Sequence, residues 1–141
     1  MKINKHIKLF FLGFLGFIVL CLVIYFSQKK QFESLINENG RYTLVVGKEI
    51  KKRRTGWAFK YNYMVNNKLY EGVVNYGYAG SRGMKIGGIY FVVFDPNKPK
   101  KNFLIKYPTV PAEINLDSIP VEGWSELPVP VPKDSIRNFL D

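Results

Sequence analysis

Residues 57–76 read WAFKYNYMVNNKLYEGVVNY, and this stretch has a hydrophobic period of two. Large aromatic residues and valine take every second position from Trp57 to Val65, which is typical of a half-buried β-strand. The pair Asn66-Asn67 follows, and asparagine tolerates the positive φ angles of a type I′ turn. The sequence therefore predicts a β-hairpin with these two asparagines at its turn.

This turn also predicts the register of the hairpin. A two-residue turn makes Val65 face Lys68, Tyr63 face Tyr70, Tyr61 face Gly72, Phe59 face Val74 and Trp57 face Tyr76. The aromatic side chains then share one face, and the ring of Tyr61 covers the bare backbone of Gly72. Such cross-strand pairs contribute about 0.2–1 kcal/mol each, so together they favour this register.

Strand-like segments flank the hairpin on both sides. Residues 42–52 carry Leu44, Val46 and Ile50 at positions of one parity. Residues 89–94 are almost entirely apolar, which is typical of a central strand, and residues 102–107 supply a fifth strand after a turn at 95–98. We expect a mainly β fold: a small five-stranded antiparallel barrel or coiled sheet of SH3-like or OB-like type.

An uncharged stretch near the start predicts location. Residues 9–26 contain no charged side chain, and as an α-helix these 18 residues would span about 27 Å, close to the thickness of a bilayer core. We expect a transmembrane helix. A cleaved signal peptide and a lipoprotein acylated at Cys21 remain alternatives, although bulky residues at 24–26 and Leu20 before the cysteine fit neither signal well.

The flanks of this stretch predict its orientation. The arm of residues 1–8 carries Lys2, Lys5 and Lys8, whereas Lys29 and Lys30 follow the span. The arm is therefore expected in the cytoplasm, with a single pass through the inner membrane and the C-terminal part outside the cytoplasm. Residues 27–40 look like a polar helical linker that ends at Asn39-Gly40, a pair suited to a left-handed helix stop.

Charge is segregated along the rest of the chain. Residues 41–106 hold fourteen Lys and Arg against three acids, a net of +11. Residues 107–141 hold two basic residues against six acids, a net of −4. We therefore divide this part into a basic β-rich domain at 41–107 and an acidic strap at 108–141.

The densest basic run is Lys51-Lys52-Arg53-Arg54. One interpretation is a solvated turn whose charges discourage edge pairing. The functional interpretations are contact with anionic lipid headgroups, with an acidic protein, or with the acidic strap of the same chain. Nucleic acid is not an expected partner, because the aromatic face must also supply the core of a small domain. Arg82, in a glycine-rich loop between strands, is a further candidate for gripping a carboxylate or phosphate.

The strap is rich in proline and apolar residues. Leu127 to Pro132 alternates apolar residues with proline, which favours an extended polyproline II conformation, and Trp124 lies just before it. Trp124, Pro128, Pro130 and Pro132 are therefore candidate partner-binding residues. The strap is expected to be ordered, either on its own basic domain or on a partner, and charge complementarity within the chain favours the former.

Catalytic chemistry has few candidates in this sequence. The chain has one cysteine and one histidine, which excludes an intrachain disulfide and most thiolate or imidazole metal sites. His6 lies three residues from the apolar stretch, and no acid is spaced to pair with a base. The glycine-rich loop precedes a strand rather than a helix, which argues against phosphate binding. We expect a protein that is not an enzyme and uses no cofactor.

A resemblance adds to this interpretation. Residues 42–48 (YTLVVGK), 61–72 (YNYMVNNKLYEG) and 86–97 (IGGIYFVVFDPN) resemble a bacterial family of small membrane-anchored proteins. These proteins carry one or more membrane spans and a β-rich extramembrane domain of unknown function. Over residues 41–105 the resemblance implies a β-rich fold and membrane association, with no catalytic residues.

These observations predict a function class. The expected protein is a non-enzymatic, single-span membrane protein that binds a protein partner, as an accessory subunit of an envelope complex. A membrane-anchored, immunity-type inhibitor of a toxin and a module that binds anionic lipid or polymer remain alternatives.

Overall fold

The computed structural model describes residues 4–77 and 83–139, which form two compact units, Met1–Ser34 and Leu35–Asp141. The first unit is the helix α1 (Lys5–Ser34), whose large apolar side chains are exposed from Ile7 to Phe26, whereas Phe32 is buried. By length and composition α1 could cross a membrane, so it is compatible with a single-pass anchor or a signal sequence. We call the second unit the β-domain.

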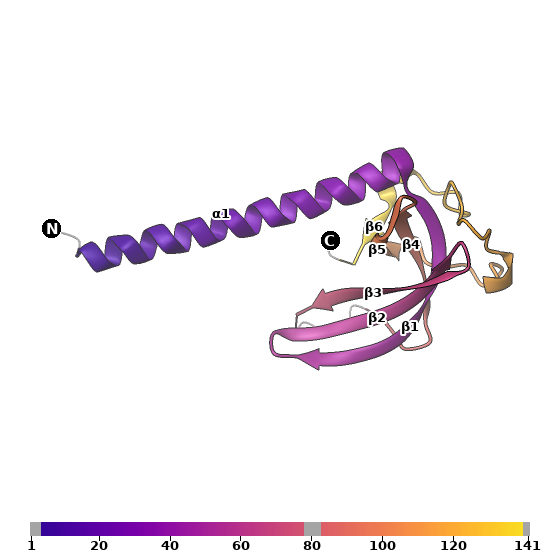
Figure 1. Cartoon of the computed structure of the whole chain (residues 1–141), viewed down its shortest axis with the longest axis horizontal. Coiled ribbons are helices and arrows are strands. Elements are labelled where there is room, and N and C mark those ends of the chain that lie inside the picture. Colours follow the sequence, from indigo (N-terminus) through magenta and orange to yellow (C-terminus); the bar gives the residue numbers. More distant parts are fainter. Residues whose placement is uncertain (1–3, 78–82, 140–141) are drawn as a thin grey trace. The chain divides into compact units, whose positions relative to one another are not determined.

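The β-domain is built on a six-stranded antiparallel sheet that curls into a half-barrel (Figure 1). In space the strand order is β3-β2-β1-β4-β5-β6. The strands are β1 (Arg41–Arg53), β2 (Gly56–Val65), β3 (Lys68–Tyr76), β4 (Ile89–Asp95), β5 (Lys98–Tyr107) and β6 (Arg137–Asn138). The predicted antiparallel β fold is confirmed, with β3 at one edge of the sheet and β6 at the other.

The hairpin of β2 and β3 has the predicted register throughout. Trp57 faces Tyr76, Tyr61 faces Gly72, and Val65 faces Lys68. Asn66 and Asn67 have φ angles of 50° and 61°, as a type I′ turn requires. The twist of this turn matches the right-handed twist of the strands, so the local sequence suffices to set the pairing.

The first strand departs from the predicted alternation. A β-bulge between Gly47 and Glu49 leaves Lys48 as the extra residue opposite β2. The bulge reverses the parity of the strand, so Val45 and Ile50 both pack on the core although their numbers differ in parity. The expectation that Leu44, Val46 and Ile50 share one face is therefore wrong.

The sheet also has one strand more than predicted. Strand β6 comes from the strap and pairs with the end of β5, with Ile105 facing Asn138 and Tyr107 facing Arg137. Two residues are too few to leave a hydrophobic period in the sequence. Strand β5 begins at Lys98, four residues before the predicted start, because Asp95 and Lys98 already pair across the turn.

The main hydrophobic cluster, which includes Phe59, Val92 and Phe94, lies on the concave face of the half-barrel, and Phe91 packs on the other face against Trp124 of the strap. Phe59, Phe91, Val92, Val93 and Phe94 are completely buried, which confirms β4 as a central strand. The aromatic rings of the core come from strands far apart in the sequence and from the strap. The ring of Phe139 in the strap lies 5.8 Å from that of Tyr90, edge to face.

The segment before β1 ends differently from the prediction. A single turn of π-helix, Leu35–Asn39, follows α1 and buries Leu35 and Ile36 within the β-domain. Neither Asn39 nor Gly40 has a positive φ, so the predicted left-handed stop is wrong. Gly40 instead donates its backbone N–H to the carbonyl of Leu35 at 2.8 Å, and a Cβ there would collide with that carbonyl and with Val93.

Candidate partner-binding surface

The predicted basic run lies at the end of the hairpin that joins β1 to β2. Lys51 pairs with Ala58, Lys52 with Trp57, and Arg53 with Gly56, so the turn lies at Arg54 and Thr55. All four basic side chains are exposed. We call Lys51, Lys52, Arg53 and Arg54 the basic end. Because rigid pairing with β2 holds the first three of them, their charges project from a fixed frame rather than from a free loop.

A hollow of about 420 Å³ lies beside the basic end. Its lining residues are Arg53, Thr55, Gly56, Trp57, Asn75, Tyr76 and Gly77, of which Trp57 is half-buried and Tyr76 is buried. These residues come from the end of β1, the start of β2 and the end of β3, which meet at one end of the sheet. An arginine beside aromatic residues suits an anionic group with an apolar neighbour.

Trp124 is placed against its own domain. Its backbone N–H donates to the carbonyl of Tyr42 at 2.7 Å, and the Tyr42 N–H donates back at 2.8 Å, so the two form an isolated antiparallel bridge. The Trp124 ring meets Phe91 edge to face with centroids 6.5 Å apart. The side chain that the sequence assigns to a partner is thus engaged by the fold of the chain itself.

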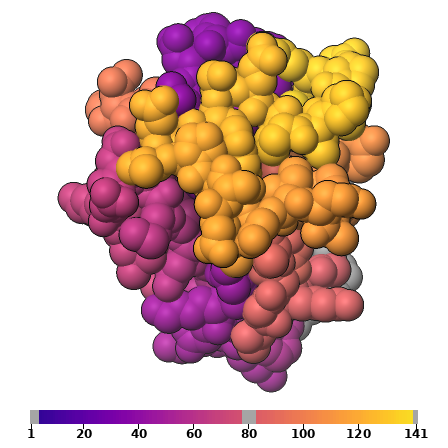
Figure 2. Space-filling view, turned by 90° about the vertical axis from the view of Figure 1, so that its right-hand side faces the viewer, coloured from indigo at the N-terminus to yellow at the C-terminus, as the bar shows by residue number. Residues whose placement is uncertain are grey.

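Further contacts hold the strap in place. The guanidinium of Arg41 donates to Glu122 at 3.1 Å and to the carbonyl of Gly123 at 2.9 Å, and the N–H of Asn66 donates to the carbonyl of Val121 at 2.7 Å. Figure 2 shows the strap, in orange to yellow, spread over this face of the molecule. The strap lies on the β-domain, as charge complementarity within the chain favours.

The proline segment forms the wall of a second hollow. Pro128, Pro130 and Pro132 are exposed, and the segment borders a space of about 410 Å³. The lining residues are Tyr42, Glu126, Leu127, Pro128, Val129, Pro130, Val131, Lys133 and Ile136. Burial, with the nearby Glu126 carboxylate as the smaller cause, raises the pKa of Tyr42 to about 12. The phenol therefore faces this space in its neutral form.

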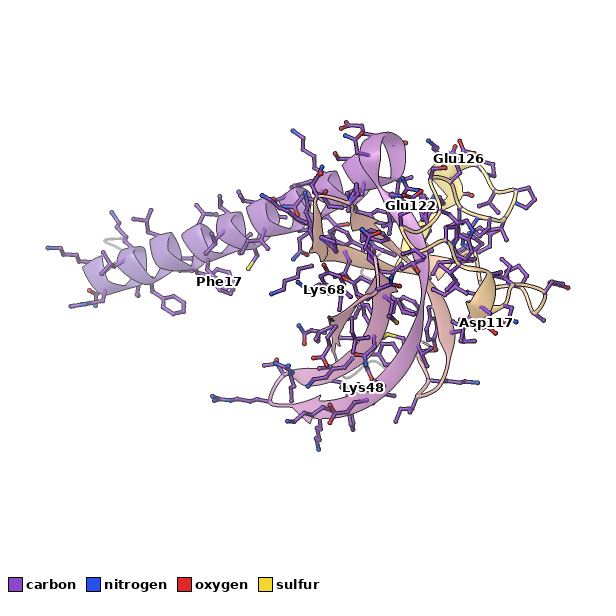
Figure 3. All side chains as sticks on the ribbon, turned by 45° about the vertical axis from the view of Figure 1, so that its right-hand side comes forward. Phe17, Lys48, Lys68, Asp117, Glu122 and Glu126 are labelled. Carbon is purple, nitrogen blue, oxygen red and sulfur yellow. The ribbon has the colours of Figure 1, made fainter. Side chains whose placement is uncertain are left out.

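Three acids of the strap lie apart from two lysines of the sheet. Asp117, Glu122 and Glu126 of the strap lie on one side, and Lys48 and Lys68 lie away from them (Figure 3). Lys48 pairs with Glu71 of β3 at 3.4 Å, and Lys60 pairs with Glu49 at the same distance. The strap thus meets the sheet through the ion pair of Arg41 with Glu122 as well as through backbone bonds, and its labelled acids lie away from Lys48 and Lys68.

The structure brings out a surface that the sequence interpretation missed. Met64, Leu69 and Val73, on the convex face of β2 and β3, are 55%, 62% and 41% exposed. Met64 and Leu69 face each other across the ladder. The signal was present in the hairpin, because all three occupy the parity opposite to the aromatic residues. Exposed apolar residues of this kind indicate an interaction surface only once β3 is known to be an edge strand.

Arg82 lies outside the described residues. The residues after it are tied to the sheet: Met84 is buried, Gly47 donates its N–H to Gly88 at 2.9 Å, and Gly87 donates to Gly47 at 2.7 Å. This tie explains why residue 47 is a glycine, since a Cβ there would collide with the carbonyl of Lys85.

The buried polar groups serve the core. The Tyr61 hydroxyl donates to Oδ1 of Asn102 at 2.6 Å, and that of Tyr63 donates to the carbonyl of Pro99. Burial raises the pKa of both tyrosines, so their hydroxyls stay protonated and donating. Among residues 4–77 and 83–139, no group of three or more His, Cys, Asp or Glu side chains is placed to hold a metal ion.

Comparison of the chain with family models, with curated proteins and with solved structures finds no match.

Proposed function

We propose that this protein is a single-span membrane protein whose β-domain binds an acidic protein partner, without catalysis, as an accessory subunit of an envelope complex. The observation that carries the proposal is the basic end: four exposed cationic side chains project from one paired hairpin beside a hollow whose lining residues include Trp57 and Tyr76. Such a surface steers an anionic partner by long-range attraction and offers a contact region for its apolar groups.

The strap has a structural part in this proposal. Its tryptophan and its C-terminal residues pack on the sheet. In this proposal Trp124 therefore holds the strap on the β-domain instead of contacting the partner. Pro128, Pro130 and Pro132 remain candidate contact residues, because they are exposed beside the second hollow. The basic end is the primary contact in this proposal, and the proline segment is a secondary one.

Anchoring and orientation are part of the proposal. The exposed apolar length of α1 supports membrane insertion, and the lysines of residues 1–8 favour a cytoplasmic N-terminus with the β-domain outside the cytoplasm. Sodium carbonate extraction of membranes, combined with a C-terminal topology reporter, tests both statements. Release of the unprocessed chain by carbonate would contradict the anchor.

The partner contact is tested by charge removal. Full-length protein is cross-linked in intact membranes and purified in mild detergent, as wild type and as a Lys51/Lys52/Arg53/Arg54→Ala variant. A Lys98/Lys100/Lys101/Lys106→Ala variant, which removes the same charge from β5, is the matched control. We expect the cross-linked partner to be lost only with the basic end. Equal recovery from all three proteins would contradict the proposal.

Lipid binding is the competing outcome of this test. Vesicles with anionic headgroups are incubated with the same three proteins in detergent-free nanodiscs of neutral lipid. Binding that depends on the basic end and disappears at high salt, without any protein cross-link, would assign the surface to anionic lipid instead.

A further inference from the structure

Strand β3 leaves one of its two edges without a partner strand. It lies at the end of the sheet order and pairs only with β2 among the strands of residues 4–77 and 83–139. The two-residue turn makes Val65 and Lys68 a hydrogen-bonded pair, so alternate residues of β3 exchange backbone bonds with β2. The intervening residues, Leu69, Glu71, Val73 and Asn75, therefore direct their N–H and C=O groups away from the sheet.

One half of this edge is more accessible than the other. Near the start of β3 the sheet curls toward β5. Tyr61, which faces Gly72, donates its hydroxyl to Asn102, and Tyr63, which faces Tyr70, donates its hydroxyl to Pro99. Toward its end β3 leads to the hollow of about 420 Å³ that Asn75 and Tyr76 line together with Arg53. The open donors and acceptors of Val73 and Asn75 thus lie next to the basic end.

The side chains along this half suit an extended peptide with apolar residues. Val73 is 41% exposed on the convex face, whereas Val74 and Tyr76 are turned to the core. A strand laid beside β3 would place alternate residues on these two faces, so apolar residues at both parities would find contacts. Glu71 is the acidic residue of β3, and its carboxylate pairs with Lys48 at 3.4 Å. This ion pair offsets the negative charge of Glu71 on the edge.

Charge selects the occupant. Residues 41–106 carry a net charge of +11, so two copies of the β-domain would repel each other, although β3 itself holds only Lys68 and Glu71. The acidic strap is engaged elsewhere, through Arg41, Tyr42 and Asn66. An acidic segment of another protein meets neither obstacle, and its carboxylate can enter the hollow beside Arg53.

We propose that the free edge of β3, from Glu71 to Asn75, binds an extended acidic peptide segment of a partner protein as an added β-strand, with a carboxylate of that segment in the hollow lined by Arg53, Trp57 and Tyr76. The inference rests on the proposed function and names the class of partner segment. Main-chain hydrogen bonds supply the affinity, and the basic end supplies the preference for acidic flanks.

Amide hydrogen exchange tests the added strand. The probe is a synthetic peptide of alternating valine and threonine with an aspartate pair at each end, added to the full-length protein in detergent micelles. We expect the exchange of the Val73 and Asn75 amides to slow by about tenfold or more when the peptide is bound. Unchanged exchange at saturating peptide would overturn the proposal. If these amides exchange slowly without peptide, and more slowly at higher protein concentration, a second copy of the chain occupies the edge. That result would also overturn the proposal.

A proline substitution separates main-chain from side-chain binding. Val73→Pro removes an N–H that points away from β2, so it breaks no bond within the sheet, whereas Val73→Ala keeps that N–H. We expect Val73→Pro to weaken peptide binding by about tenfold and Val73→Ala to weaken it by less than about threefold. Near-UV circular dichroism checks that each variant keeps its fold. If Val73→Pro unfolds, the exchange measurement on wild type decides alone.

The outcomes distinguish this inference from the proposed function. Loss of the cross-linked partner in the basic-end variant, with unchanged exchange at Val73 and Asn75, would keep the partner surface and reject the added strand. A peptide with lysine in place of aspartate tests the chemistry of the occupant. Equal affinity of the two peptides would reject the preference for acidic segments.

Discussion

Tyr42 and Trp124, 82 residues apart in the chain, exchange two backbone hydrogen bonds, of 2.8 Å and 2.7 Å. This bridge joins the strap to the first strand of the sheet, at the place where the Trp124 ring packs against Phe91. The strap is therefore an integral part of the β-domain, and its removal would expose one face of the sheet. Partner-binding experiments that delete the strap would disturb the fold as well as any contact.

Truncation of Trp124 tests this conclusion. We expect Trp124→Ala to lower the free energy of unfolding by about 2 kcal/mol, because the ring covers Phe91 and its loss loosens the bridge. Denaturation of the full-length protein in detergent micelles measures the effect. Val121→Ala is the control within the strap, since its side chain is 59% exposed, and its stability should stay close to that of wild type.

The contact between Tyr61 and Gly72 predicts a second effect. A Cβ at residue 72 would collide with the Tyr61 ring, which a hydrogen bond to Asn102 holds in place. We expect Gly72→Ala to lower the free energy of unfolding by about 2 kcal/mol. Gly77→Ala is the matched control, because its Cβ would meet nothing within 4 Å. Equal stability of the two variants would show that the Tyr61 ring can move aside.

The turn between β2 and β3 makes a third prediction. Asn67 has a φ of 61°, a conformation that a β-branched residue strongly disfavours. We expect Asn67→Val to lower the free energy of unfolding by about 1.5 kcal/mol and Asn67→Gly to raise it slightly. Urea unfolding measures both changes. Asn97→Val is the control, because Asn97 is an exposed turn residue without a positive φ. A similar loss in both valine variants would argue against the turn conformation.

The buried phenol of Tyr42 predicts a pH dependence. Burial first, and the Glu126 carboxylate second, raise its pKa from 10.0 to about 12 in the folded protein. The unfolded chain therefore releases this proton before the folded protein does, so the contribution of Tyr42 is complete below pH 10 and is lost as the pH rises toward 12. Thermal unfolding between these values should show a smaller fall in Tm for Tyr42→Phe than for wild type. Parallel curves would contradict the assignment.

Local signals in the sequence predicted much of the fold. The alternation of residues 57–65 and the Asn66-Asn67 pair specify the hairpin, because cross-strand pairs and turn angles depend on neighbours in the chain. The apolar run of residues 89–94 likewise specifies a central strand. The basic end could be predicted as a cluster for the same reason, since its four residues are consecutive.

What depends on distant contacts could not be predicted in this way. The bulge at Lys48, the two-residue strand β6 and the bridge from Trp124 to Tyr42 leave no period or spacing in the sequence. The free edge of β3 and the hollow beside Arg53 belong to this group, because both depend on which strands become neighbours. The sequence by itself determined an apolar helix, a hairpin with its register and a concentration of positive charge, all of which follow from short-range chemistry. Only the tertiary structure decided which strand keeps an unpaired edge and where the strap lies, because burial and pairing between remote segments are properties of the folded sheet.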